Sequence, residues 1–327
     1  MKKQILSLFI IIAILTVIVG CSNNGTAGPG EKTYKIGLMQ SSNVDEASIT
    51  IYNGVMDAAE KYGVEITYGE IGGDHTKITS LLETMLVQDV DAIIDSTWNA
   101  DVGLNTSQTC KVEGLPLVTC DVGYDDYAHL VGANNYSSGQ INGKFVEELV
   151  KEEWDGEIEY VIAMYGFASG EGVKSRLIGC LDHLDEVGLL PPEENVIWQD
   201  NKGQTDPTRV IVADFLTAHP EAKKIYILTN NDSGALGAYN AVLTADREDD
   251  CIITSYNADS FALEHLATVE DSCWKGTVNF NLYGYGELAI PALLEILETG
   301  EDNIPHELNT ETFVINRSNV HEYYNED

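Results

Sequence analysis

The sequence predicts an α/β protein made of two similar lobes, each a Rossmann-like open sheet of parallel strands flanked by helices. Short apolar runs alternate with amphipathic stretches of helical length, the pattern of repeated β-α-β units. After Tyr136 the alternation starts again. With 44% hydrophobic residues the chain is globular, and its 327 residues suit two domains better than one.

Each lobe has its own series of elements. Gly63, Gly114, Gly188 and Pro220 mark helix ends. In the first lobe we expect strands at YKIGLM, VEITYG, DAIIDS and LPLVTC, and helices over 47–62, 75–88 and 100–112. In the second we expect strands at YVIAMY, NVIWQ, KIYILT and CIITSY, and helices over 172–187, 207–218 and 233–245.

The segment after each expected strand is polar or small. These segments are QSSNVDEAS, TWNAD, DVGYDD, GFASGEG, NNDSG and NADS. Ligands of open α/β sheets bind at the carboxyl ends of the strands, where helix N-terminal N–H groups also converge. Two such lobes facing each other predict a polar cleft for a small, hydroxyl-rich ligand.

The charge of the chain is strongly acidic. Without Lys2 and Lys3 it carries 16 basic against 53 acidic side chains, a net charge of about −37. Nucleic acid is therefore excluded as a partner. No Cys-x-x-Cys or Cys/His metal spacing occurs, so we expect no metal and no cofactor. The sequence leaves open whether Cys251 and Cys273 form a disulfide.

The first 21 residues have the pattern of an export signal. Two lysines precede an apolar run over residues 5–19, which is short for a membrane span of about 20 residues. The ending IVGC resembles the lipobox of bacterial lipoproteins, whose Cys carries a lipid. We expect residues 1–20 to be removed, Cys21 to be lipidated and 21–33 to form a flexible tether. The alternative is an uncleaved signal anchor.

Six segments together resemble the sugar-binding, ribose-binding-protein-like class of type I periplasmic binding proteins. The resemblance covers residues 34–316, and its strongest part is LTAHPE followed by NNDSGALGA. The segments are YKIGLMQSSNVDEASITIYNGVMDAAEKYGVEI, DAIIDSTWNADV, LPLVTCD, GANNYSSGQINGKFVEEL, FLTAHPEAKKIYILTNNDSGALGAYNAV and GTVNFNLYGYGELAI.

This resemblance implies two lobes joined by a three-stranded hinge, with crossings near Asn135, 280–282 and 308–313. Closure at the hinge would trap one ligand per monomer for an ABC permease and its ATPase, at the outer face of the cell membrane. No ATP site is expected in this chain, because GFASGEGVKS lacks the phosphate-loop spacing. The implied lobes are 34–135 plus 281–312, and 136–280 plus 313–327.

The resemblance also implies ligand contacts. The family's cleft carboxylate falls on Asp121, its amide on Asn231 and its arginine on Lys174. The other family positions fall on Ser41, Asp45, Tyr256, Asn257 and Phe280.

The aromatic positions depart from the family. The rings that sandwich a sugar in the relatives fall on Ala47 and Ser48, and a third falls near Gly203. Trp98 is the candidate replacement, with packing against neighbouring helices as the alternative. This departure disfavours ribose itself but still allows another polyhydroxylated molecule.

Three other functions were considered. An enzyme could use Asp45, Asp121 and Lys174 for acid–base chemistry, but no nucleophile motif, metal spacing or paired histidine accompanies them. A gene repressor of related fold would carry a DNA-reading segment where this chain has the signal. A receptor that presents its ligand to a sensor kinase or chemoreceptor remains the alternative to transport.

Overall fold

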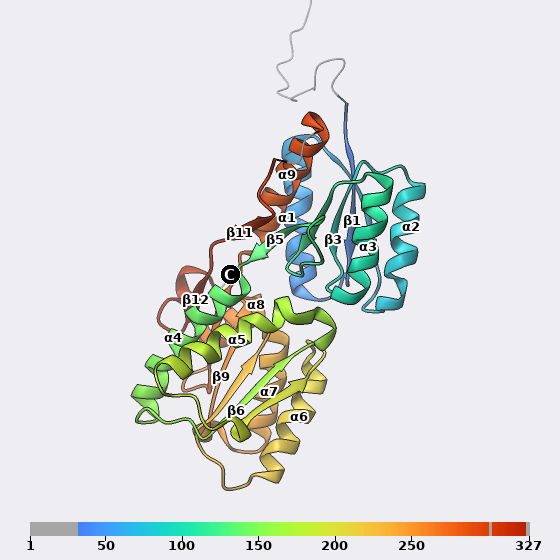
Figure 1. The fold of residues 1–327 in the computed structure, drawn as a ribbon. Coiled ribbons are helices and arrows are strands. Elements are labelled where there is room, and N and C mark those ends of the chain that lie inside the picture. The colour runs from blue at the N-terminus through green and yellow to red at the C-terminus, as the bar shows by residue number, and fades with distance from the viewer. Residues whose placement is uncertain (1–31, 301–302, 325–327) are drawn as a thin grey trace, which may run out of the picture. The chain divides into compact units, whose positions relative to one another are not determined.

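The computed structural model of the protein describes residues 32–300 and 303–324. The expected signal, Cys21 and nearly all of the expected tether lie outside the described residues. The chain divides into the units Met1–Lys32 and Thr33–Asp327, and the second contains every described helix and strand (Figure 1). This unit holds complete cores, so we expect it to fold by itself.

The first sheet has the strand order β11-β5-β4-β3-β1-β2, and all of its strands are parallel. We call this sheet with its helices the N-lobe. Its central strands are mostly apolar and almost entirely buried, as expected for a sheet covered on both faces. The strands are β1 (Lys35–Gln40), β2 (Glu65–Glu70), β3 (Ala92–Ser96), β4 (Leu117–Cys120), β5 (His129–Ala133) and β11 (Glu307–Thr310).

The second sheet has the order β12-β10-β9-β8-β6-β7, and β12 alone runs antiparallel to its neighbour β10. We call this sheet with its helices the C-lobe. The two orders confirm the predicted fold class of two open, mostly parallel sheets. The strands are β6 (Tyr160–Tyr165), β7 (Val196–Asp200), β8 (Ile225–Thr229), β9 (Cys251–Asn257), β10 (Trp274–Asn279) and β12 (Phe313–Asn316).

The helices begin and end at local signals. The side chains of Asp45, Asn99 and Asn231 cap α1, α3 and α7 by accepting hydrogen bonds from backbone N–H groups. Gly63 and Gly114 end α1 and α3 in the left-handed conformation. The helices are α1 (Glu46–Tyr62), α2 (Ile78–Val87), α3 (Ala100–Glu113), α4 (Asn135–Glu153), α5 (Gly170–Glu186), α6 (Thr205–Ala218), α7 (Asp232–Thr244), α8 (Ser260–Thr268) and α9 (Tyr285–Thr299).

The described chain passes between the two sheets three times. It leaves the first sheet after β5, returns after β10 into α9, and leaves again between β11 and β12. Helix α4 then packs on α5, and α9 packs on α1 (Figure 1). The loops that follow the carboxyl ends of β1–β5 and β6–β9 can therefore meet between the lobes.

Cysteine pairing was left open by the sequence. Cys251 and Cys273 are both buried free thiols, as are the other three cysteines of the described residues. Burial raises the pKa of the Cys273 thiol to about 12, which keeps it protonated and unreactive. Among the described helices, none combines the length and apolar character needed to cross a membrane.

Candidate functional site

A cavity of about 690 Å³ lies where the carboxyl ends of the two sheets meet. Its lining comes from the segments after β1 to β4 of the N-lobe and after β6 to β9 of the C-lobe. A second hollow of about 490 Å³ lies beside α4 at the start of β10, away from these strand ends. Because ligands of open α/β sheets bind at the carboxyl ends, the larger cavity is the candidate site.

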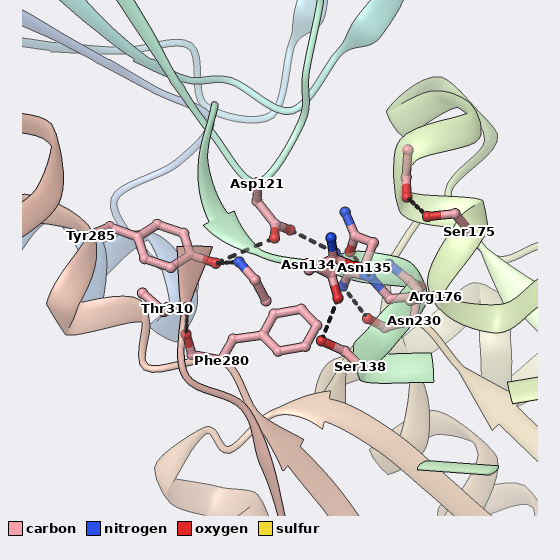
Figure 2. A network of polar contacts seen from close by, with 12 residues as sticks. Asp121, Asn134, Asn135, Ser138, Ser175, Arg176, Asn230, Phe280, Tyr285 and Thr310 are labelled. Atoms are coloured by element: carbon pink, nitrogen blue, oxygen red, sulfur yellow. Dashed lines mark hydrogen bonds and ion pairs between the residues drawn. The ribbon is translucent and has the colours of Figure 1, made fainter. Parts of the chain in front are cut away.

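A buried ion pair joins the lobes at the floor of this cavity. The Arg176 side chain is 2% exposed, and its Nη2 lies 2.8 Å from Asp121 Oδ2. Its Nε donates to Asn135 Oδ1 at 2.8 Å, and its Nη1 donates to the Asn230 carbonyl at 2.9 Å (Figure 2). Tyr285 donates its hydroxyl to the other oxygen of Asp121 at 3.3 Å. Both charges are therefore fully partnered within the protein.

Two aromatic rings support the guanidinium of Arg176. Its central carbon lies 4.6 Å from the centre of the Phe280 ring and 5.6 Å from that of Tyr256. The Tyr256 hydroxyl donates to the Arg176 carbonyl at 3.1 Å and accepts from Asn142. Cation–π contact with desolvated rings strengthens this placement and restricts the side chain to one orientation.

Three residues at strand ends have backbone angles that non-glycine residues rarely adopt. The φ angle is 58° at Trp98, 67° at Asp121 and 117° at Asn257. All three line the cavity. Such conformations are costly and cluster at ligand-binding sites, so their coincidence here supports a functional role for the cavity.

Two side chains of the cavity wall are held in place at helix N-termini. Asp45 Oδ1 accepts from the Ser48 N–H at 2.8 Å at the start of α1. Asn231 Oδ1 accepts from the Gly234 N–H at 2.9 Å at the start of α7, and its Nδ2 donates to the Gly203 carbonyl at 2.9 Å. The wall is thus organised before any ligand binds.

A pair of buried carboxylates lies beside the cavity. Asp232 is fully buried and accepts from the hydroxyls of Ser255 and Thr277 and from the Asp259 N–H. Burial raises its pKa to about 7. Burial and the neighbouring charge of Asp232 likewise raise the pKa of Asp259, which lines the cavity, well above its usual range.

The cavity also has an exposed aromatic ring. Phe167 follows β6, lines the cavity and is 48% exposed, with its ring centre 4.8 Å from that of Tyr165. Trp98 lines the N-lobe side and packs partly against the core. Trp98 and Phe167 therefore place one large apolar ring from each lobe in the cavity wall.

The comparison with protein families decides the classification. The model of the periplasmic binding protein domain matches residues 36–302 of this chain. The chain belongs to the periplasmic binding protein family. Family membership implies that the protein acts outside the cytoplasm.

Relatives of this periplasmic binding protein include the ribose import binding protein RbsB of Bacillus subtilis. The two are 23% identical over 278 residues, 84% of each chain. A solved ABC transporter solute binding protein from Mycobacterium smegmatis with bound glycerol has a TM-score of 0.77 and 18% identity, covering 90% of this chain and 98% of the other. The fructose binding periplasmic domain of a hybrid two component system has a TM-score of 0.74 and 22% identity, covering 88% and 92%.

Six of the nine ligand residues expected from the sequence line the cavity of this binding protein. They come from both lobes, as the strand-end argument predicts. These six are Ser41, Asp45, Trp98, Asp121, Asn231 and Asn257.

The other three expected residues do not line the cavity. Tyr256 and Phe280 are fully buried beneath the guanidinium of Arg176. Lys174 pairs with Glu171 at 3.1 Å and lies 5.8 Å from the Trp198 ring. Residues two apart in an α-helix are rotated by about 200° around its axis and lie on nearly opposite faces. Lys174 and Arg176 therefore cannot both face the cavity.

Among the cavity residues of this binding protein that the sequence argument missed, four matter most for the site. Arg176 could have been considered beside Lys174, because both lie in the first two turns of the helix that follows β6. Phe167 was overlooked because its segment, GFASGEG, is otherwise small and polar. Asn230 and Asp259 each lie within two residues of an expected contact, Asn231 or Asn257, and only the backbone geometry distinguishes them.

Proposed function

We propose that this protein is the substrate-binding component of an ABC importer and captures a small, sugar-like polar molecule in the interlobe cavity. The observation that carries the proposal is the cavity itself, about 690 Å³ in volume, where polar strand ends of both lobes converge. That volume suits a small ligand that is buried on most of its surface. The named function of the Bacillus subtilis relative, ribose import, supports a sugar-like ligand.

The mechanism follows from which polar groups are already partnered. Arg176 and Asp121 hold the lobes together through a direct ion pair, and Tyr256 and Phe280 keep the guanidinium in place. We therefore assign Tyr256 and Phe280 as positioning residues. Ligand hydroxyls would bond to Ser41, Asp45, Asn231 and Asn257, and rings would contact Trp98 and Phe167. Lys174 keeps only a peripheral electrostatic role in this proposal.

Closure completes the mechanism. The three passages between the sheets would bend so that the lobes, 34–135 plus 281–312 and 136–280 plus 313–327, close on the ligand. The permease with its ATPase would then receive the ligand from the closed monomer, which Cys21 would tether to the outer face of the membrane. The protein performs no chemistry in this scheme and requires no cofactor.

A ligand panel tests the proposal. Residues 33–327 would be screened with sugars, polyols and nucleosides by thermal melting. A ligand at 100 times its Kd stabilises the protein by about 2.7 kcal/mol, which is roughly 5 °C in Tm for a chain of this size. No shift with any member of the panel, together with turnover in hydrolase or transferase assays, would overturn the proposal.

Two variants then test the site. Asn231→Asp keeps the cap of α7 but removes the Nδ2 donor, and Phe167→Ala removes the exposed ring. We expect each to weaken binding about tenfold, and Asn231→Asp should also cost about 1 kcal/mol of stability because it loses the hydrogen bond from Nδ2 to the Gly203 carbonyl. Unchanged affinity in both variants would mean that the ligand binds elsewhere.

A receptor for a sensor kinase is the second candidate. It is favoured by the similarity to the fructose binding periplasmic domain of a hybrid two component system. Reconstituted uptake with a permease distinguishes the two, because a receptor would bind the ligand without supporting its transport.

A further inference from the structure

The cavity has an excess of negative charge. Its lining includes Asp45, Glu46, Asp200 and Asp259, in addition to the Asp121 that pairs with Arg176. The carboxylates of Asp45, Glu46 and Asp200 accept hydrogen bonds from backbone N–H groups. Among the described residues, Lys202 is the one further lysine or arginine in that lining. A cavity wall of one dominant sign concentrates ligands of the opposite sign, and the net charge of −35 extends this field beyond the site.

The excess charge centres on Asp259. This residue is 5% exposed and stands at the start of α8, with its backbone N–H bonded to the buried Asp232 at 2.8 Å. Glu46 reaches the same point from the N-lobe, where it accepts from the Ser260 hydroxyl at 3.0 Å. Within residues 32–300 and 303–324, neither Asp232 nor Asp259 has a lysine, arginine or histidine at ion-pair distance. Carboxylates buried without a counter-ion must take up a proton or a cation.

An unpartnered acceptor in the cavity lining indicates, independently, that the ligand carries a hydrogen-bond donor. Asn230 lines the cavity and is 7% exposed, and its Oδ1 has no hydrogen-bond partner in the described part of the chain. A buried acceptor without a partner is costly, and a ligand N–H or O–H would satisfy it. Asn230 follows β8 and Asp259 follows the neighbouring strand β9, so both lie on the C-lobe side of the cavity.

We propose that the ligand is a polyhydroxylated molecule with a cationic amine, such as an amino sugar or an aminated cyclitol, whose ammonium group binds beside Asp259. This inference rests on the proposed function and narrows its ligand class. An ammonium group supplies both the missing charge and up to three donors, whereas a neutral hydroxyl supplies no charge. A metal ion is the less suitable cation, since the described residues contain no group of three or more metal-ligating side chains.

The test compares matched pairs of ligands on residues 33–327 by calorimetry at pH 7.5. The pairs are glucose with glucosamine, galactose with galactosamine, and an inositol with its amino-deoxy analogue. The N-acetyl derivatives provide the same nitrogen without the charge. We expect at least one amine to bind tenfold or more tightly than its hydroxyl and N-acetyl partners.

Asp259→Asn and Asp259→Ser should each bring this ratio close to one, and both residues are suited to a helix start. Asp214→Asn, on the exposed face of α6, is the matched control and should leave the ratio unchanged. Neutral sugars that bind as tightly as their amines would overturn the inference and leave the proposed function standing. An amine preference that survives both Asp259 variants would also overturn it. If no member of either set binds, the inference is overturned, whereas the proposed function fails only if the wider panel of sugars, polyols and nucleosides also gives no melting shift.

Discussion

The ion pair between Arg176 and Asp121 is expected to be the main polar link between the lobes. Replacing Asp121 by Asn removes the charge while keeping the shape of the side chain. Asn also tolerates the φ angle of 67° at this position, whereas Ala would add strain of about 1 kcal/mol. Asp121→Asn therefore isolates the electrostatic contribution.

The magnitude follows from the burial of the guanidinium. Arg176 is 2% exposed and its other two partners, Asn135 and the Asn230 carbonyl, are neutral. Removing the single carboxylate leaves a buried cation without a counter-charge, which typically costs 3–5 kcal/mol. Asn can still accept one hydrogen bond, and Asp121 is 15% exposed at the cavity edge, so we expect a loss of about 3 kcal/mol.

Equilibrium unfolding of residues 33–327 in guanidinium chloride, followed by tryptophan fluorescence, measures this loss. Asp214→Asn on α6 should change the free energy of unfolding by less than about 0.5 kcal/mol. The double variant Asp121→Asn/Arg176→Met should be more stable than the sum of the two single variants predicts, by about 2 kcal/mol. A loss below 1 kcal/mol for Asp121→Asn, or additive effects in the cycle, would refute the assignment of a buried, coupled pair.

Two further predictions concern packing and pH. A Cβ atom at Gly139 of α4 would lie 2.1 Å from the Arg176 carbonyl oxygen, so Gly139→Ala should lower the free energy of unfolding by about 2 kcal/mol. Gly172 has open space around it, so Gly172→Ala should raise the free energy of unfolding by about 0.5–1 kcal/mol. Urea unfolding checks both, and equal effects would contradict the close approach of α4 and α5. Burial raises the folded-state pKa of Asp232 to about 7, so the folded state holds the proton of this carboxyl more tightly than the unfolded state does. The contribution of Asp232 to the free energy of unfolding therefore falls as pH rises from about 4 to 7. Relative to Asp232→Asn, the wild type should lose up to about 1.4 kcal/mol per pH unit in that window, and parallel curves would argue against a buried proton.

The alternation of apolar runs with helical stretches was sufficient to predict four strands of each sheet. It did not reveal the other elements, such as β5 and α4. The HLVGA run of β5 is short and contains a glycine, and the first half of α4 is rich in Asn, Ser and Gly, which have low helix propensity. Tertiary packing decides α4, because Gly139 and Gly143 allow its backbone to approach α5. Because packing between two helices decides α4, neither helix alone has a periodic sequence pattern that predicts it.

The sequence predicted those residues of the candidate site that lie at the ends of strands. Asp121 follows β4 directly, Asn231 lies two residues after the end of β8, and both line the cavity. Rotation about a helix axis and the burial of rings are set by tertiary contacts, so Lys174 was preferred to Arg176 and Phe280 was expected to contact the ligand. In the structure Arg176 occupies the centre, and Phe280 packs against it from below the cavity.

These placements separate the polar groups that build the cavity from those available to a ligand. Asp121 and Arg176 partner each other, and the Oδ1 of Asn231 caps a helix. By contrast, Asn230 Oδ1 and Trp98 Nε1 have no hydrogen-bond partner within the described residues. A ligand gains most where it pairs groups that the protein leaves unpaired, and an unsuitable ligand loses most at the same positions. Discrimination among sugar-like molecules should therefore depend more on Asn230, Trp98 and Asp259 than on the central ion pair.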